Sequence, residues 1–206
     1  MKSQNLAWIF VAAMAGFALT ACDDEKGSYV NGNDVGSPCS CEGDGCAIGE
    51  IPLPHPTKGT IVGCENVDMT GITGGELVCL QSISQDASTM APPTYFPQGY
   101  CAISAVSCTG STLCATASYG SVETFDRCPA GHVLIDSTFQ YAIVEKDSVI
   151  VNKTCVKSCE SNADCNGDGE IYCLKREGHR FCYNENNFDF LCNSEDDCSN
   201  VTYTEF

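Results

Sequence analysis

The stretch CVKSCESNADCNGDGEIYCLKREGHRFC, residues 155–182, decides the fold class of this chain. It holds five cysteines in the spacing C-x3-C-x5-C-x7-C-x8-C, with short polar segments and few large apolar residues between them. A segment of this kind has little apolar surface to bury, so disulfides must stabilise it. The sequence therefore predicts a small disulfide-rich fold of short β-strands, hairpins and loops, with little helix after the N-terminal segment.

Pieces of this spacing recur along the chain. Residues 75–81 (GELVCLQ) parallel residues 169–175 (GEIYCLK), and a Cys-Glu pair stands upstream of each, at residues 64–65 and 159–160. This similarity favours a small unit that is used more than once. Chance spacing in a cysteine-rich chain is the alternative. A second recurring feature, the spacing C-x5-C, is found at Cys108/Cys114, Cys159/Cys165 and Cys192/Cys198.

Residues 1–21 are typical of an export signal. Lys2 supplies a charged start, and residues 6–18 form an apolar run that is shorter than the roughly 20 residues of a membrane span. The sequence LTAC at residues 19–22 follows, and it resembles the lipobox of bacterial lipoproteins. The resemblance implies cleavage between Ala21 and Cys22, a diacylglycerol on the Cys22 thiol, and often a further acyl group such as palmitate on its amine. An ordinary secretory signal with a chance cysteine is the alternative.

The number of cysteines agrees with lipidation. The chain has 17 cysteines, and removing Cys22 as the lipid carrier leaves 16, which can all pair. Exported cysteines are mostly oxidised, and no C-x2-C pair typical of a zinc site occurs, so we predict structural disulfides. The candidates are Cys39, Cys41, Cys46, Cys64, Cys79, Cys101, Cys108, Cys114, Cys128, Cys155, Cys159, Cys165, Cys173, Cys182, Cys192 and Cys198.

Composition divides the rest of the chain into three parts. Residues 22–37 are acidic and rich in Gly, Asn and Ser, which predicts a flexible tether between lipid and body. Residues 38–151 are expected to form a β-rich region that contains cysteines. Residues 152–206, rich in Cys, Asn, Asp and Glu, are expected to form a disulfide-rich C-terminal module.

Strand patterns lie mainly in the middle of the chain. Residues 60–62 and 76–80 are short β-type runs bounded by glycine. The aromatic cluster at residues 95–100 is predicted to cover a small core, and ligand binding is the alternative.

A hairpin is predicted between residues 132 and 151. Residues 132–135 are a β-type run, and residues 139–144 alternate as expected of a half-buried strand. A polar turn at residues 145–147 and a returning strand at residues 148–151 complete the hairpin.

The charge of the chain limits its partners. It has 10 Lys and Arg against 27 Asp and Glu, a formal net charge of −17. A phosphate backbone would repel such a surface, so we expect no nucleic-acid binding. The membrane through the lipid anchor, a protein ligand or a cation are the partners we expect, and a solubilising surface is the simplest interpretation of the charge.

One acidic cluster resembles a calcium loop. Asp164, Asn166 and Asp168, followed by Gly169, match the first positions of an EF-hand loop. The position of the closing bidentate glutamate is occupied by Lys175. Asp, Asn and Gly also favour ordinary turns, so we expect an ordinary loop and no cofactor, with calcium binding as the alternative.

Signals for catalysis are few. The only histidines are His55, His132 and His179, and no G-x-S-x-G or H-E-x-x-H motif occurs. We therefore expect no enzymatic activity, with an envelope hydrolase or redox enzyme built around His132 or His179 as the alternative. Asn152-Lys-Thr154 and Asn200-Val-Thr202 fit glycosylation acceptors.

As a whole, the chain resembles the cysteine-rich lipoproteins of myxobacteria-type bacteria, which combine a lipobox, a polar tether and C-x5-C units such as Cys159–Cys165. The spacing of Cys159, Cys165 and Cys173 is also similar to the N-terminal cysteine-rich region of dickkopf-type secreted proteins, which implies a protein-binding module. We therefore expect a lipid-anchored protein of the bacterial cell envelope, facing the periplasm or the cell surface, with disulfide-bonded binding or scaffold modules.

Overall fold

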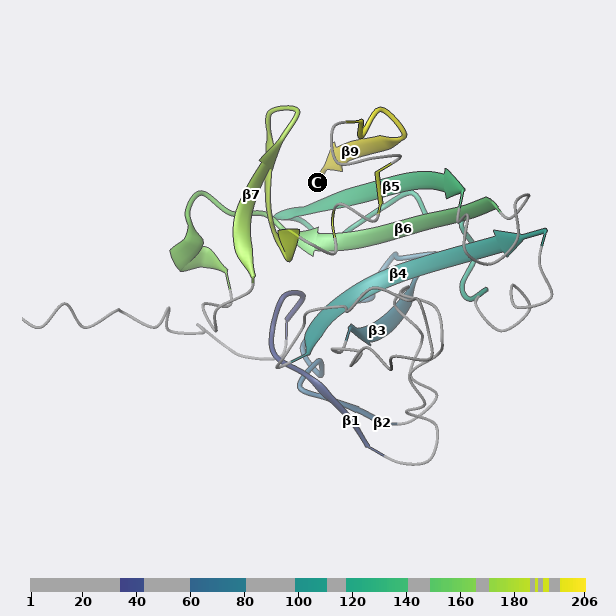
Figure 1. Cartoon of the computed structure of the whole chain (residues 1–206). Helices are drawn as coiled ribbons and strands as arrows, with labels where there is room; N and C mark the ends of the chain where they lie inside the picture. Colours follow the sequence, from purple (N-terminus) through teal and green to yellow (C-terminus); the bar gives the residue numbers. More distant parts are fainter. Residues whose placement is uncertain are drawn as a thin grey trace, which may run out of the picture.

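The computed structural model describes residues 34–42, 60–80, 99–110, 118–140, 149–165, 171–185, 188, 191–192 and 197–206. These residues form nine β-strands and one short 3-10 helix (Figure 1). The elements are β1 Ser40–Glu42, β2 Thr60–Val62, β3 Glu76–Leu80, β4 Tyr100–Thr109, β5 His132–Gln140, β6 Val149–Lys157, η1 Asn162–Asp164, β7 Tyr172–Arg176, β8 His179–Tyr183 and β9 Val201–Glu205. The predicted disulfide-rich β-fold is confirmed.

The centre of the molecule is an antiparallel five-stranded sheet in the order β3-β4-β6-β5-β9. Two antiparallel pairs accompany it, β1–β2 and β7–β8. Figure 1 shows the β7–β8 hairpin standing at one end of the sheet, across the direction of its long strands. The hairpin is joined to the sheet by a bridge between Ser158 and Phe181.

Several strand predictions are confirmed. β2 and β3 have the predicted bounds. β5 and β6 pair antiparallel, which confirms the predicted antiparallel pair; its register, with Gln140 opposite Val149, differs from the one that a turn at residues 145–147 implies. The predicted turn itself lies outside the described residues.

The sequence patterns did not predict β4, the longest strand of the sheet. Residues 100–108 of this strand are buried except for the half-buried Ser107, because β4 lies between β3 and β6 and both of its faces are covered. A strand that is buried on both faces lacks the polar–apolar alternation by which half-buried strands are found in a sequence.

The division placed after Val151 falls inside β6. This strand runs from Val149 to Lys157, and β9 at the end of the chain returns to pair with β5. The segments on the two sides of residue 151 therefore share one sheet.

The two faces of the sheet pack against different partners. On one face, the side chains around Val106 and Val156 pack with Leu174 and Phe181 of the hairpin and with Phe188. The other face packs against a second set of segments. Its cluster of buried residues is Val35, Ile103, Ala105, Phe125, Cys128, Leu134 and Cys155. Each fully buried large apolar side chain contributes about 1.5–3 kcal/mol, so the apolar sheet adds substantially to what the disulfides supply.

Tyr100 joins the sheet to the hairpin. Its side chain is 0% exposed, its hydroxyl donates to the Cys182 carbonyl at 2.9 Å, and it accepts from the Lys157 amide at 3.3 Å. Burial raises the pKa of this phenol well above its ordinary value. For Tyr100, core packing is therefore the correct interpretation of the 95–100 cluster; the other aromatic residues of the cluster lie outside the described residues.

Candidate functional site

Four cysteines form what we call the sheet cystine unit: Cys39, Cys64, Cys79 and Cys101. Cys39 is bonded to Cys79, and Cys64 is bonded to Cys101. Cys79 on β3 and Cys101 on β4 are directly opposite each other in the sheet. The chain approaches this unit very closely at Gly99, which has φ +70° and where a Cβ would collide with the Cys39 carbonyl.

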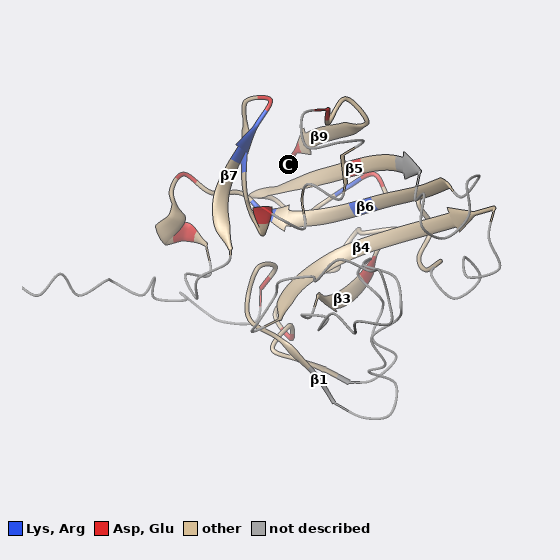
Figure 2. Ribbon diagram, in the orientation of Figure 1, with Lys and Arg blue, Asp and Glu red and all other residues tan. Residues whose placement is uncertain are grey.

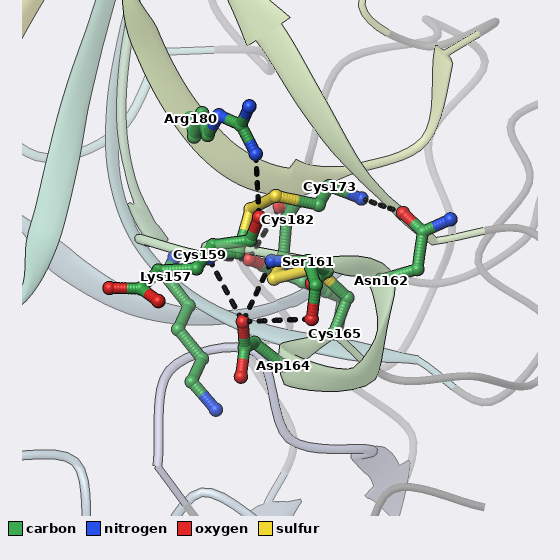
Figure 3. Close-up of a disulfide and its surroundings, with 11 residues drawn as sticks. Lys157, Cys159, Ser161, Asn162, Asp164, Cys165, Cys173, Arg180 and Cys182 are labelled. Atoms are coloured by element: carbon green, nitrogen blue, oxygen red, sulfur yellow. Dashed lines mark hydrogen bonds between the residues drawn. A yellow bond between two sulfur atoms is a disulfide. The ribbon is translucent and has the colours of Figure 1, made fainter.

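A second set, the hairpin cystine unit, consists of Cys159, Cys165, Cys173 and Cys182. Cys159 is bonded to Cys173, and Cys165 is bonded to Cys182. Cys173 on β7 and Cys182 on β8 are directly opposite each other in the hairpin. Figure 3 shows the two disulfides beside η1, where the Cys173 amide also donates to the Asn162 side chain at 2.9 Å.

The two units have the same disulfide connectivity and the same placement of cysteines on paired strands. In each, the first cysteine bonds to the third and the second to the fourth, and the third and fourth face each other on adjacent antiparallel strands. Cys79 and Cys173 occupy equivalent places, as the matching heptapeptides predict. The two Cys-Glu pairs are not equivalent, because Cys64 is the second cysteine of its unit and Cys159 is the first of the other.

The C-x5-C spacing does not define one structural unit. Cys192 and Cys198 are bonded to each other, whereas Cys159 and Cys165 bond to different partners. Equal spacing therefore does not fix pairing, because the strand partners decide which sulfurs meet.

The remaining cysteines complete the cross-links. Cys128 on a loop is bonded to Cys155 of β6, and Cys108 of β4 is also disulfide-bonded. Cys22, Cys46 and Cys114 lie outside the described residues, as does the side chain of Cys41, and so does Ala21 of the predicted cleavage site.

Sulfur atoms approach closely in both units. The Sγ atoms of Cys39, Cys64 and Cys101 lie within 4.8 Å of one another. The Sγ atoms of Cys159, Cys165 and Cys173 do the same. Soft metals bind deprotonated thiolates, and all of these sulfurs are bonded in disulfides. The geometry thus places the two disulfides of each unit side by side.

Asp164, the first residue of the proposed calcium loop, caps η1. Its Oδ2 accepts from the Glu160 and Ser161 amides, each at 2.9 Å, and from the Ser161 hydroxyl at 3.3 Å (Figure 3). The two amide hydrogen bonds hold the pKa of this carboxyl below its ordinary value. The other two predicted ligands, Asn166 and Asp168, lie outside the described residues.

Cations gather on the outer face of the hairpin. Lys175 is directly opposite Arg180, and because side chains on a strand alternate, both share the face that carries Cys173 and Cys182. Arg180 Nη1 donates to the Glu160 carbonyl at 2.6 Å. Figure 2 shows this basic end of the hairpin. The sequence patterns did not predict this arrangement, because the two-residue turn Glu177–Gly178 is only a weak hairpin signal.

The described histidines lie apart from each other. His132 is buried, with Nδ1 close to the Pro129 and Ala130 carbonyls. His179 stacks on Tyr203, and its Nδ1 lies 2.8 Å from Glu205 Oε1. Within the described part of the chain, neither histidine is hydrogen-bonded to a serine or a thiol. His55 lies outside that part.

The structure places both asparagines of the glycosylation motifs in internal contacts. Asn152 is 0% exposed in β6, and the Thr154 hydroxyl donates to its Oδ1 at 3.1 Å. The Asn200 amide donates to the Thr138 and Leu191 carbonyls at 3.0 and 2.6 Å. In the folded protein, Asn152 is therefore inaccessible to a glycosyltransferase.

A comparison with protein-family models, curated proteins and solved structures finds no match for this chain. Within the described residues, no helix is long and apolar enough to cross a membrane. The fold and the two cystine units define the described body as a disulfide-bonded β-sheet protein.

Proposed function

We propose that this protein is a bacterial lipoprotein of the cell envelope, held to the membrane by lipid on Cys22, and that its cross-linked body binds or scaffolds a partner without catalysing a reaction. The observation that carries the proposal is the extent of oxidation: the sheet and the hairpin each contain two adjacent disulfides, and further disulfides join the loops. Disulfides at this density persist in exported proteins.

The sequence at the start of the chain supports the anchor. LTAC at residues 19–22 has the residue types of a lipoprotein cleavage site, and loss of one cysteine to lipid leaves an even number for pairing. Two or three acyl chains hold a protein firmly to a bilayer, because each buried methylene contributes about 0.8 kcal/mol.

The hairpin supports a binding role for the body. It stands at one end of the sheet (Figure 1) and exposes Tyr172, Lys175 and Arg180. Disulfides fix both of its strands to the segment around η1. Lys175 and Arg180 share one face of this rigid strand pair and Tyr172 lies on the other, so the basic face is the surface that we propose for binding, and it loses little conformational entropy when a partner binds.

Mass spectrometry of the intact protein from native membranes tests the proposal. The expected mass is that of a chain that begins at Cys22 and carries diacylglycerol, and it should rise on reduction by two hydrogens for each disulfide. A chain that retains residues 1–21, or one with an unmodified N-terminus at residue 22, would overturn the anchor.

A further inference from the structure

We propose that the Cys159–Cys173 disulfide is a reaction site for low-molecular-weight thiols, and that attack there switches the hairpin cystine unit to a second pairing, Cys159–Cys165 with Cys173–Cys182. The inference concerns the chemistry of the folded body and does not depend on the lipid anchor. It rests on the accessibility of one sulfur, the charges around it and the distances between sulfurs.

Accessibility distinguishes this disulfide from those of the sheet cystine unit. Cys173 is half-buried, whereas no cysteine of the sheet unit is more than 7% exposed. Cys173 is thus the most exposed of the eight cysteines in the two units, and we expect a thiolate in solution to reach it without opening of the sheet. Access to a sulfur is one of the main determinants of the rate of thiol–disulfide exchange.

The surrounding charges favour attack by an anion. Lys175 and Arg180 lie on the face of the hairpin that carries Cys173 and Cys182. Among the described residues of the η1 segment, the carboxylates are those of Glu160 and Asp164, and Asp164 already accepts three hydrogen bonds. The cations attract the incoming thiolate and stabilise the thiolate that leaves, because a neighbouring positive charge lowers a thiol pKa.

The exchange balances without an oxidant or a reductant. The external thiolate attacks Cys173 Sγ, a mixed disulfide forms, and Cys159 leaves as a thiolate. Cys159 Sγ lies within 4.8 Å of Cys165 Sγ, so it can attack Cys165 and displace Cys182 as a thiolate. Cys182 is opposite Cys173 across the hairpin; it attacks Cys173 and releases the external thiolate. Each step breaks one S–S bond and forms one, and the thiol is regenerated.

The second pairing changes what the disulfides connect. At present both of them tie the segment around η1 to the hairpin, one to β7 and one to β8. In the second pairing, Cys159–Cys165 would close the η1 segment on itself, and Cys173–Cys182 would close the hairpin on itself. The hairpin would then lose its covalent links to η1 and keep only hydrogen bonds to that segment, such as that from the Cys173 amide to Asn162, which makes the proposed binding surface responsive to thiols.

Disulfide mapping tests the proposal on the full mature protein. The folded protein is incubated with increasing reduced glutathione, quenched with an alkylating reagent and cleaved after glutamate. Cleavage after Glu160, Glu170, Glu177 and Glu185 separates the four cysteines into different peptides. We expect linkage of the Cys159 peptide to peptide 161–170, and of peptide 171–177 to peptide 178–185, before any cysteine of the sheet unit is alkylated.

Two variants test whether a positive charge near the disulfide speeds the exchange. Lys175→Gln should slow the appearance of the new linkages by about 2–5-fold, the effect of one nearby charge, whereas Arg127→Gln, another exposed cation, should leave the rate unchanged. The proposal is overturned if the original pairing persists until the sheet unit is reduced, if Cys159 and Cys173 become alkylated without the new linkages, or if the two variants react at the same rate.

Discussion

The two cystine units share a plan but differ in what surrounds them. The sheet cystine unit lies between β3 and β4, and its four cysteines are packed with Ile61, Val67 and Leu77. The hairpin cystine unit lies at one end of the sheet; Cys159, Cys165 and Cys182 are buried there, whereas Cys173 is half-buried and lies on the face that carries Lys175 and Arg180. The same covalent pattern can therefore act as an internal staple in one place and as an accessible site in another, because burial decides reactivity.

The two cystine units differ most in the length of the chain segments that their disulfides close. The disulfides of the sheet unit close sequence separations of 40 and 37 residues, and those of the hairpin unit close 14 and 17. In the chain-entropy relation, removal of Cys64–Cys101 should cost about 4 kcal/mol and removal of Cys159–Cys173 about 3 kcal/mol.

Urea unfolding, monitored by circular dichroism, measures this difference in two double variants. They are Cys64→Ser/Cys101→Ser and Cys159→Ser/Cys173→Ser. Each pair of serines avoids a free thiol. A larger loss from the hairpin pair than from the sheet pair would contradict the ranking.

Tyr100→Phe should break the link between the two regions. The hydroxyl of this buried residue is bonded to the Cys182 carbonyl and the Lys157 amide, and its removal leaves both without that partner. We expect a loss of about 2 kcal/mol in the free energy of unfolding. Tyr203→Phe, which keeps the ring stacked on His179 and Phe181, is the control and should change stability little. An equal effect of both substitutions would show that the buried contact is unimportant.

Glu177→Asn should stabilise the hairpin. Glu177 has φ 48° in the two-residue turn between β7 and β8, a conformation that asparagine adopts more readily than glutamate. The expected gain is about 1 kcal/mol, seen as slower hydrogen exchange in β7 and β8. Glu177→Ala, which lacks the favourable turn chemistry, serves as the control; a gain of the same size in that variant would argue against a backbone origin.

The smallest predicted effect is on the pH dependence of stability, through the carboxylate of Asp164. The folded-state pKa of Asp164 lies below its ordinary value, so its contribution to stability is present above the unfolded pKa of about 3.9 and is lost as the pH falls through the folded value. Asp164→Asn should weaken η1 at neutral pH by about 0.5 kcal/mol and flatten the pH dependence of unfolding below about pH 4. A pH dependence unchanged from that of the original protein would contradict this role for the carboxylate.

Much of the fold class was predictable, because cysteine density and short β-type runs are local features. β2, β3 and the pairing of β5 with β6 follow from such runs. β4 was missed because it is buried on both faces, and the continuity of β6 was missed because the polar composition after Val151 suggested a boundary where the strand continues.

The candidate site was predictable only in part. The sequence similarity around Cys79 and Cys173 indicated a repeated unit, but pairing depends on which strands are neighbours, and spacing alone misassigned the role of Cys64. The opposition of Lys175 to Arg180 depends on the hairpin register, which a turn without Asn-Gly or Asp-Gly signals weakly.

The most direct test of the account is a non-reducing peptide map of the untreated native protein. It should give Cys39–Cys79 and Cys64–Cys101 in the sheet unit, and Cys159–Cys173 and Cys165–Cys182 in the hairpin unit, with none of these eight cysteines alkylated. Free thiols at these positions, or pairing of first to second and third to fourth cysteine in either unit of the untreated protein, would contradict it.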